Sequence, residues 1–406
     1  MSPRTPAIVQ SSDLSHLSLN RVLFPAGPAL DDRSWIAENQ RTISALFRCI
    51  EANSCTQNQT KVVLLVASPF RELLEGANGG EAIWANSTLI ALRRLGYNYL
   101  YSNSMARASQ LYHIFGALIP VVFVDVPDAY SCFQDENCIL SRLRPHGIPA
   151  WKILSFHFWD SPDNPLGRRW TLSPEDYRGS EGNTYLGYSV EPQCSRQPFV
   201  PHSHRKEQAY VLAKEARYFA PDVDRAHDPD SFEAAAAAID IRFLAGVRER
   251  VLPEYFPRNI TNVGFMSAPQ FYATLAESRV LVGVGVPFTS PTPWEALCLG
   301  VPFINPIHHW SADAPLDKTH WVSQHAALKH LDPPYVYNVF KGDKAGFVRA
   351  VVDAIAHPIQ SFVAEDMRMR AVEVRLAAVF ETDWRSEAAR LLAEQQASGS
   401  GEAFWL

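Results

Sequence analysis

Short apolar runs alternate with longer amphipathic segments in the first half of the chain. The run Val62-Val63-Leu64-Leu65-Val66 is continuous and rich in β-branched residues, which is typical of a strand buried on both faces of a parallel sheet. Apolar residues recur at helical spacing from Glu81 to Leu95, and Gly96 stands where a helix C-terminal glycine belongs. Leu118 to Val124 is a further strand candidate. Strands that alternate with helices predict a parallel sheet with crossover connections.

A second series of the same kind follows an irregular segment. Residues 160–197 are rich in aromatic residues, proline and glycine, and we expect loops there rather than regular structure. The strand pattern resumes at Ala209-Tyr210-Val211-Leu212 and returns over Arg279 to Val284, with a helix expected over Phe232 to Val251. The tail from Ala345 to Glu394 is predicted to be largely helical.

Two α/β series in a chain of 406 residues predict two lobes, since this length exceeds one ordinary hydrophobic core. We place an N-terminal extension at residues 1–60, with a helix around Trp35 to Ile50 that packs on the first lobe. A first Rossmann-like lobe with an irregular connector is expected at 61–200 and a second Rossmann-like lobe at 201–380. Residues 381–406 are assigned to a C-terminal helix and tail.

Charge and hydropathy exclude two classes of partner. The net charge is −6, and no run of lysine or arginine is present, so we expect no nucleic-acid partner. No stretch of about 18 apolar residues occurs, and we expect no membrane span in this chain.

Cysteines and glycosylation sequons bear on the compartment. Cys49 and Cys55 form one closely spaced pair and Cys132 and Cys138 another, while Cys194 and Cys298 stand apart. Close pairs either form disulfides in an oxidising compartment or remain small buried thiols in the cytosol. The Asn-x-Thr sequons at Asn58, Asn86 and Asn259 are glycosylated only if the chain enters the secretory route.

The segment from Val282 to Leu297 carries the most chemical information. A strand ends in Gly283-Val284-Gly285, a loop with Pro287 and Phe288 follows, and a helix begins near Pro293 and Trp294. Thr292 and Glu295 have the spacing of a capping box, with Pro293 at the first helical position. Backbone N–H groups at a helix start attract anions, and glycines let phosphates approach the chain. We therefore expect a diphosphate at this turn.

Glu295 has two interpretations. Its carboxylate either completes the capping box or accepts hydrogen bonds from the two ribose hydroxyls of a nucleotide. One conformer cannot fully do both.

This segment resembles the donor-site motif of glycosyltransferase family 18, a family of N-acetylglucosaminyltransferases. The matching features are the Gly-x-Gly turn, the aromatic residue after proline and the sequence Pro291-Thr292-Pro293-Trp294-Glu295-Ala296. Gly300 to Pro306, Trp170 to Pro174 and Tyr185 to Glu191 continue the resemblance, which spans roughly Lys61 to Phe380. It implies a GT-B fold, with two Rossmann-like lobes whose parallel sheets face each other across a cleft.

The activity that the resemblance implies is inverting transfer of N-acetylglucosamine from UDP-GlcNAc to a mannose hydroxyl of an N-glycan, in β-1,6 linkage. The first lobe would hold the glycan or glycoprotein acceptor and the second lobe the nucleotide-sugar donor. No cofactor and no metal are implied. The family works in the Golgi lumen, and the paired cysteines and sequons favour the same compartment.

The resemblance also assigns a general base. Gly79-Gly80-Glu81-Ala82-Ile83-Trp84 matches the glycine-rich block whose glutamate takes the proton of the acceptor hydroxyl. From the residues alone, Glu81 is equally a first-turn acid stabilised by the helix dipole. A base benefits from partial desolvation, for which Trp84 is a candidate neighbour. A glycan on Asn86 would obstruct this helix, so we expect that sequon to be unmodified.

Without a metal, the charge of the leaving nucleotide must be met by protein cations. Lys214, at the end of a predicted strand, matches a lysine of the family pattern, and Lys318 and Lys341 are further candidates. His308 and His309 follow the donor segment and are candidates for the same ligand. The triplets Asp222-Val223-Asp224, Asp228-Pro229-Asp230 and Glu381-Thr382-Asp383 are interpreted as solvated surface rather than metal ligands.

Three alternatives share the fold. The first is a GT-B enzyme with a different donor or acceptor, since the fold supports many. The second is a non-catalytic protein that binds nucleotide sugars or glycans, against which the presence of both Glu81 and Glu295 counts. The third is a sugar isomerase or epimerase, which needs no acceptor.

Overall fold

The computed structural model describes residues 34–77, 79–159, 164–176, 182–399, 401 and 404–406. Residues 1–33 of the predicted extension and 160–163 of the predicted connector lie outside these ranges. The chain divides into two compact units, of which the first comprises Met1–Tyr188 and Met369–Leu406 and the second comprises Ser189–Arg368.

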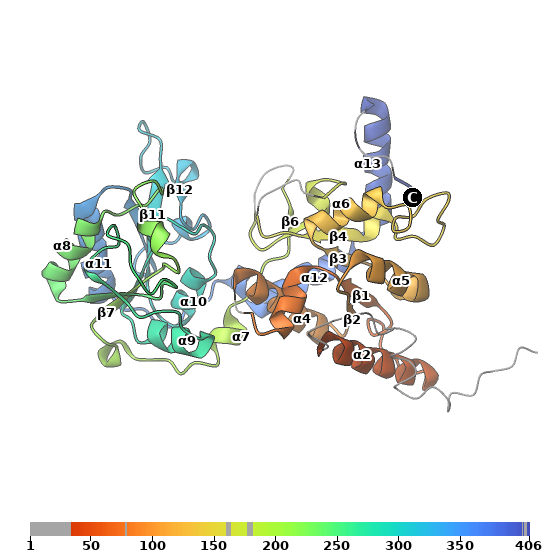
Figure 1. Ribbon diagram of the computed structural model, residues 1–406, viewed down its shortest axis with the longest axis horizontal. Helices are drawn as coiled ribbons and strands as arrows, with labels where there is room; N and C mark the ends of the chain where they lie inside the picture. The colour runs from red at the N-terminus through yellow and green to blue at the C-terminus, as the bar shows by residue number, and fades with distance from the viewer. Residues whose placement is uncertain (1–33, 78, 160–163, 177–181, 400, 402–403) are drawn as a thin grey trace, which may run out of the picture. The chain divides into compact units, whose positions relative to one another are not determined.

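A parallel sheet in the order β2-β1-β3-β4-β5-β6 forms the centre of the first unit (Figure 1). All four residues of β1 are buried, as expected for an apolar strand covered on both faces. The strands are β1 Val62–Leu65, β2 Asn98–Tyr101, β3 Val122–Val124, β4 Ile153–Phe156, β5 Thr171–Ser173 and β6 Thr184–Tyr185, and the helices are α2 Ser34–Glu51, α3 Ser68–Leu74, α4 Gly80–Arg94, α5 Met105–Phe115, α6 Val126–Gln134, α12 Met369–Glu381 and α13 Trp384–Ser398.

Helix α2 packs on the edge strand β2 through one buried amide. Asn39 donates from Nδ2 to the carbonyl oxygen of Tyr101 at 2.8 Å and accepts from the N–H of Tyr101 at 2.7 Å. The amide thereby pairs with backbone groups that an edge strand would otherwise leave open.

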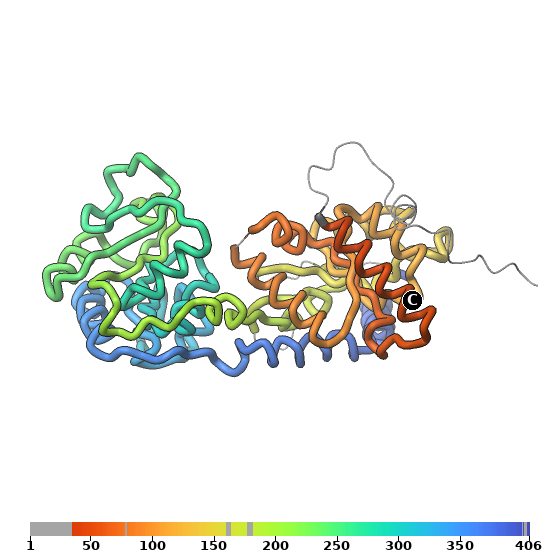
Figure 2. The backbone as a smooth tube through the Cα atoms, turned by 90° about the horizontal axis from the view of Figure 1, so that it is seen from below, coloured from red at the N-terminus to blue at the C-terminus, as the bar shows by residue number. Residues whose placement is uncertain are grey.

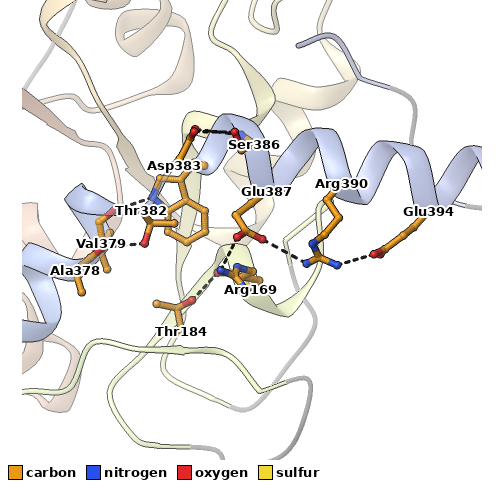
Figure 3. Close-up of polar contacts among 11 residues, drawn as sticks. Arg169, Thr184, Ala378, Val379, Thr382, Asp383, Ser386, Glu387, Arg390 and Glu394 are labelled. Atoms are coloured by element: carbon orange, nitrogen blue, oxygen red, sulfur yellow. Dashed lines mark hydrogen bonds and ion pairs between the residues drawn. The ribbon is translucent and has the colours of Figure 1, made fainter.

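The C-terminal helices belong to the first unit, and Figure 2 shows this blue segment beside the orange elements of the unit. The ring of Phe380 on α12 stacks on Tyr97 at 4.2 Å. On α13, Glu387 pairs with Arg169 at 3.0 Å (Figure 3). Residues 369–380, predicted from sequence to lie in the second lobe, belong to the first unit instead. Helical periodicity marks an apolar face but does not say which sheet that face covers.

The second unit holds a parallel sheet in the order β9-β8-β7-β10-β11-β13, with the short strand β12 antiparallel to β11. This is the order 3-2-1-4-5-6 of the Rossmann fold. The predicted α/β class with two Rossmann-like units, the composition of GT-B proteins, is thus confirmed, while the cleft stays a prediction. The elements are α7 Glu191–Cys194, β7 Gln208–Val211, α8 Pro229–Ile239, β8 Arg242–Ala245, β9 Ile260–Asn262, α9 Ala268–Ala276, β10 Val280–Val282, α10 Thr292–Cys298, β11 Phe303–His309, β12 Val322–Ser323, β13 Val336–Phe340 and α11 Lys344–Ala356.

Two local predictions were wrong. The helix expected over Phe232 to Val251 ends at Ile239, because Asp240 adopts the left-handed conformation, and the residues that follow form β8. The connector expected to be irregular contains β5 and β6, which extend the first sheet. Both errors concern short strands whose partners are distant in sequence, so local pattern carries little signal for them.

All six cysteines are paired in disulfides, namely Cys49–Cys55, Cys132–Cys138 and Cys194–Cys298. The two close pairs therefore match the disulfide alternative, and Cys194 and Cys298, which stand apart in sequence, meet at a Cα–Cα distance of 6.1 Å. None of the helices in the described ranges is long and apolar enough to cross a membrane.

Candidate functional site

The strand order of the second unit reverses between β7 and β10. Strands β8 and β9 follow on one side of β7, whereas β10, β11 and β13 lie on the other. In open parallel sheets, ligands bind beyond the carboxyl ends of the strands at such a reversal. The chain leaves β7 toward the exposed Lys214 and leaves β10 through Gly283-Val284-Gly285. The fold therefore brings these predicted donor residues to one edge of the sheet.

The turn after β10 has room only for glycines. A Cβ at Gly283 would lie 2.3 Å from Oε1 of Gln324, and a Cβ at Gly285 would lie 2.6 Å from Cε1 of His308. Gly285 also has a φ of +108°, which favours glycine. Gln324 holds the turn from behind, since its Oε1 accepts from the N–H of Gly285 at 2.9 Å and its Nε2 donates to the carbonyl of Pro287 at 3.2 Å.

The remaining donor-segment residues differ in exposure. Phe288 is 39% exposed, and its ring lies 5.4 Å from the ring of His308. Pro293 and Trp294 are buried on α10, with the Trp294 ring edge-on to His325 at 5.7 Å. Phe288 is thus available to a ligand at the turn, whereas Trp294 supports the helix from inside.

Glu295 is buried in the first turn of α10 and is only 2% exposed. Burial raises the pKa of its carboxyl group to about 7, against the opposing effect of hydrogen bonds from the side chains of Tyr272 and Thr292. The hydroxyl of Tyr272, on α9, donates to Oε1 of Glu295. The carboxyl group therefore titrates near neutral pH at the edge where the nucleotide is expected.

The capping box predicted for this helix is wrong. The N-cap of α10 is Pro291, no side chain caps it, and Thr292 is already the first helical residue. Thr292 with helical backbone angles cannot act as an N-cap, whose angles are not helical. The carboxylate of Glu295 instead accepts from the side chains of Tyr272 and Thr292, and its contact with a nucleotide stays a prediction.

A charged cluster lies beside the glycine turn. Nε2 of His308 is 3.0 Å from the carbonyl oxygen of Gly285, and its Nδ1 is 2.9 Å from Oδ2 of Asp224. Lys341 hydrogen-bonds the other oxygen of Asp224, and this contact holds the pKa of Asp224 below its usual range. Asp224 is exposed, as expected, but its carboxylate is also held by the ammonium group of Lys341 and the ring of His308, which come from the ends of β13 and β11.

Other predicted residues lie outside this cluster. Lys318 forms an ion pair with Asp332 at 2.7 Å. Asp230 pairs with Lys344 at 2.7 Å, and Asp383 accepts from the N–H of Ser386 as the N-cap of α13. These acids have structural partners in the fold.

Glu81 lies in the first turn of α4, in the first unit, and its side chain is exposed. It is thus accessible to an acceptor. Trp84 is fully buried and stacks on Phe156 at a centroid distance of 3.4 Å, so in this structure its ring belongs to the core.

Comparisons with known proteins identify the family. The model of glycosyltransferase family 18 matches residues 149–387, more than half of the chain. The chain belongs to glycosyltransferase family 18. The match contains the whole donor segment and Lys214, while Glu81 lies before it.

The chain is also similar to individual proteins. Alpha-1,6-mannosylglycoprotein 6-beta-N-acetylglucosaminyltransferase A of Cricetulus griseus is 20% identical over 255 residues, covering 56% of this chain and 33% of the relative. The chain thus spans about a third of the length of the relatives it matches. Two solved structures are similar over most of the chain. A glycotransferase of kitacinnamycin is 14% identical, the match covers 82% of this chain and 98% of that chain, and the TM-score is 0.38. Sucrose-phosphate synthase from Thermosynechococcus elongatus is 12% identical, the match covers 84% of this chain and 100% of that chain, and the TM-score is 0.41.

Sequence reasoning missed two residues that shape the site. Tyr272 and Gln324 are far in sequence from the residues they contact, and neither stands in a motif that we recognised. Only the fold identifies them, because it places α9 beside α10 and the residue after β12 beside the glycine turn.

Proposed function

We propose that the protein is an inverting glycosyltransferase that transfers N-acetylglucosamine from UDP-GlcNAc to a mannose hydroxyl of an N-glycan, in β-1,6 linkage and without a metal ion. The observation that carries the proposal is the topology of the second unit: Lys214 follows β7 and the Gly283–Gly285 turn follows β10, the two strands on either side of the strand reversal, and the next helix, α10, carries Glu295. The named activity of the similar transferase supports the choice of donor and acceptor.

Each part of the donor has a partner in this proposal. The diphosphate lies at the loop between β10 and α10, where backbone N–H groups at the start of the helix attract anions. Lys214 neutralises the charge that develops on the leaving UDP. The ribose hydroxyls donate to the carboxylate of Glu295 alongside the Tyr272 hydroxyl.

In the transfer step, the acceptor oxygen attacks the anomeric carbon while the bond from that carbon to the diphosphate oxygen breaks. Glu81 takes the proton of the acceptor hydroxyl, and UDP leaves with the electron pair of the broken bond. Attack from the face opposite to UDP inverts the anomeric centre. Glu81 is exposed, so an acceptor can reach it, and the bound acceptor would desolvate the carboxylate.

The three disulfides support a site of action in the lumen of the secretory pathway, such as the Golgi, because disulfides persist in oxidising compartments.

UDP release tests the proposal directly. We expect the protein to release UDP from UDP-GlcNAc when a mannose-terminated N-glycan is present, to keep its rate in EDTA, and to form a β-1,6 linkage. GDP-mannose and UDP-galactose serve as donor controls. Release from another donor would reassign the donor, epimerised UDP-sugar without acceptor would indicate an epimerase, and UDP binding without turnover would indicate a binding protein.

A further inference from the structure

The three Asn-x-Thr sequons lie in different structural settings. Asn58 is half-buried, and its Nδ2, the atom that a glycan would occupy, donates to the carbonyl oxygen of Leu95 at 2.9 Å. That bond ties the segment before β1 to the end of α4. A glycan on Asn58 would replace one of the two hydrogens on this nitrogen and place a sugar next to the half-buried contact with Leu95.

Asn86 lies within α4, between buried residues. Ser87 and Thr88 are both fully buried, and the Thr88 hydroxyl donates to the carbonyl oxygen of Trp84 at 3.0 Å. The hydroxyl that a sequon needs for recognition is thus enclosed in the core. Asn86 also shares its helix with Glu81, the proposed base.

Asn259 differs from both. Its side chain is exposed, as is that of Thr261, and it lies in a turn closed by the N–H of Ile260 and the carbonyl of Pro257 at 3.1 Å. The turn leads into β9, the last strand on one side of the second sheet. A glycan here extends into solvent without breaking a contact of the fold.

Topology also separates Asn259 from the proposed donor site. Because β9 runs parallel to β8, β7 and β10, its first residues lie at the amino edge of the sheet. The glycine turn and Lys214 follow the carboxyl ends of β10 and β7, at the opposite edge. A bulky group on Asn259 therefore leaves the carboxyl edge open.

We propose that Asn259 carries an N-linked glycan and that Asn58 and Asn86 do not. The pairing of all six cysteines supports passage through an oxidising lumen, where this modification occurs. In the modification, the amide nitrogen of Asn259 forms a bond to the anomeric carbon of an oligosaccharide carried on a polyprenyl diphosphate. The bond from that carbon to the diphosphate oxygen breaks, and the amide proton and the polyprenyl diphosphate are released.

The test is to secrete the full chain from a eukaryotic cell behind a cleavable leader and to digest it with peptide:N-glycosidase. We expect one step in electrophoretic mobility, lost in N259Q and T261A and retained in N58Q and N86Q. T261S keeps the sequon and should keep the step, which separates loss of the acceptor from damage to β9. A step that persists in N259Q, or secreted wild-type protein without a step, would overturn the proposal. The glycan is read without an activity assay, so this result is independent of the proposed transferase function.

Discussion

The hydroxyl of Tyr272 donates a hydrogen bond to Oε1 of Glu295, and this contact joins α9 to α10 at the edge of the second sheet. The two groups affect each other's titration. Burial and the neighbouring carboxylate raise the pKa of Tyr272, so it remains a donor at all physiological pH values. Glu295, with its pKa raised to about 7, changes charge in the range where a transferase operates.

Glu295 should make the stability of the second unit depend on pH. Its folded-state pKa of about 7 exceeds the ordinary value of 4.5, so the folded state binds the proton more tightly than the unfolded state. The resulting stability is fully present below pH 4.5 and is lost as pH rises to 7, an effect of about 3 kcal/mol. Denaturant unfolding of E295Q and wild type at pH 5 and pH 7.5 measures it.

As pH rises from 5 to 7.5, the free energy of unfolding of E295Q should increase relative to that of wild type, because only wild type loses the contribution of the protonated Glu295. E233Q removes an exposed carboxylate of α8 and is the control, with no such relative change. A difference between E295Q and wild type that is the same at pH 5 and pH 7.5 would contradict the assignment.

Removing the Tyr272 hydroxyl should weaken nucleotide binding at neutral pH. The hydrogen bond from Tyr272 lowers the pKa of Glu295, so in Y272F that pKa rises further and more of the carboxyl group is protonated at pH 7. A protonated carboxyl group accepts fewer hydrogen bonds from ribose. We expect calorimetry to show weaker UDP binding by Y272F at pH 7 and recovery toward the wild-type Kd at pH 8.5.

Y255F, which removes a hydroxyl elsewhere in the second unit, should bind UDP as wild type does. Loss of affinity in Y272F that is equal at both pH values would mean that the hydroxyl acts only on packing.

Glu81 can be tested by separating turnover from donor binding. A positioned general base contributes about 10²–10⁴-fold to rate, so E81Q should lose turnover on that scale while its Kd for UDP stays unchanged. E72Q removes an exposed carboxylate on the preceding helix α3 and should keep both parameters. Near-normal turnover in E81Q would exclude Glu81 as the base.

The glycine turn predicts a contrast between two substitutions. Gly285 and Gly342 both have positive φ values, +108° and +80°. A Cβ added at Gly285 would lie 2.6 Å from His308, whereas a Cβ added at Gly342 would have no atom within 4 Å. Backbone strain alone costs about 1 kcal/mol, so we expect G342A to lose about that much stability. G285A should lose more and should also bind UDP more weakly, because the turn must move. Equal losses in stability and in UDP affinity would show that the contact with His308 is relieved without cost.

The residues that sequence alone located share one property, which is that their signal is local. The apolar run of β1, the helix α4 with its terminal glycine and the Gly-x-Gly turn after β10 are each encoded within a few neighbouring residues. The strand β8 was missed because its four residues follow an alanine-rich helix, and their conformation depends on pairing with β7 and β9.

The site follows the same division. The turn and the position of Glu295 were predictable, but the burial that raises the pKa of Glu295 depends on α9, which precedes it by a strand. The partners of Asp224 come from the ends of two later strands. Contacts of this kind depend on which strands become neighbours, and a single sequence carries no local record of that order.

The disulfide Cys194–Cys298 should contribute more to stability than Cys49–Cys55. Its two cysteines are 104 residues apart in sequence, compared with 6 for the other. In the chain-entropy model the longer loop gives about 5 kcal/mol and the shorter about 2 kcal/mol.

Cys298 also ends α10, so we expect the double variant C194A/C298A to bind UDP more weakly, whereas C49A/C55A, in the first unit, should keep its UDP affinity. Hydrogen exchange measures the units separately, through the amides of β10 and of β1. If the amides of β10 in C194A/C298A and those of β1 in C49A/C55A lose equal protection, the stability that each disulfide contributes would depend on local packing around the sulfurs and not on loop length.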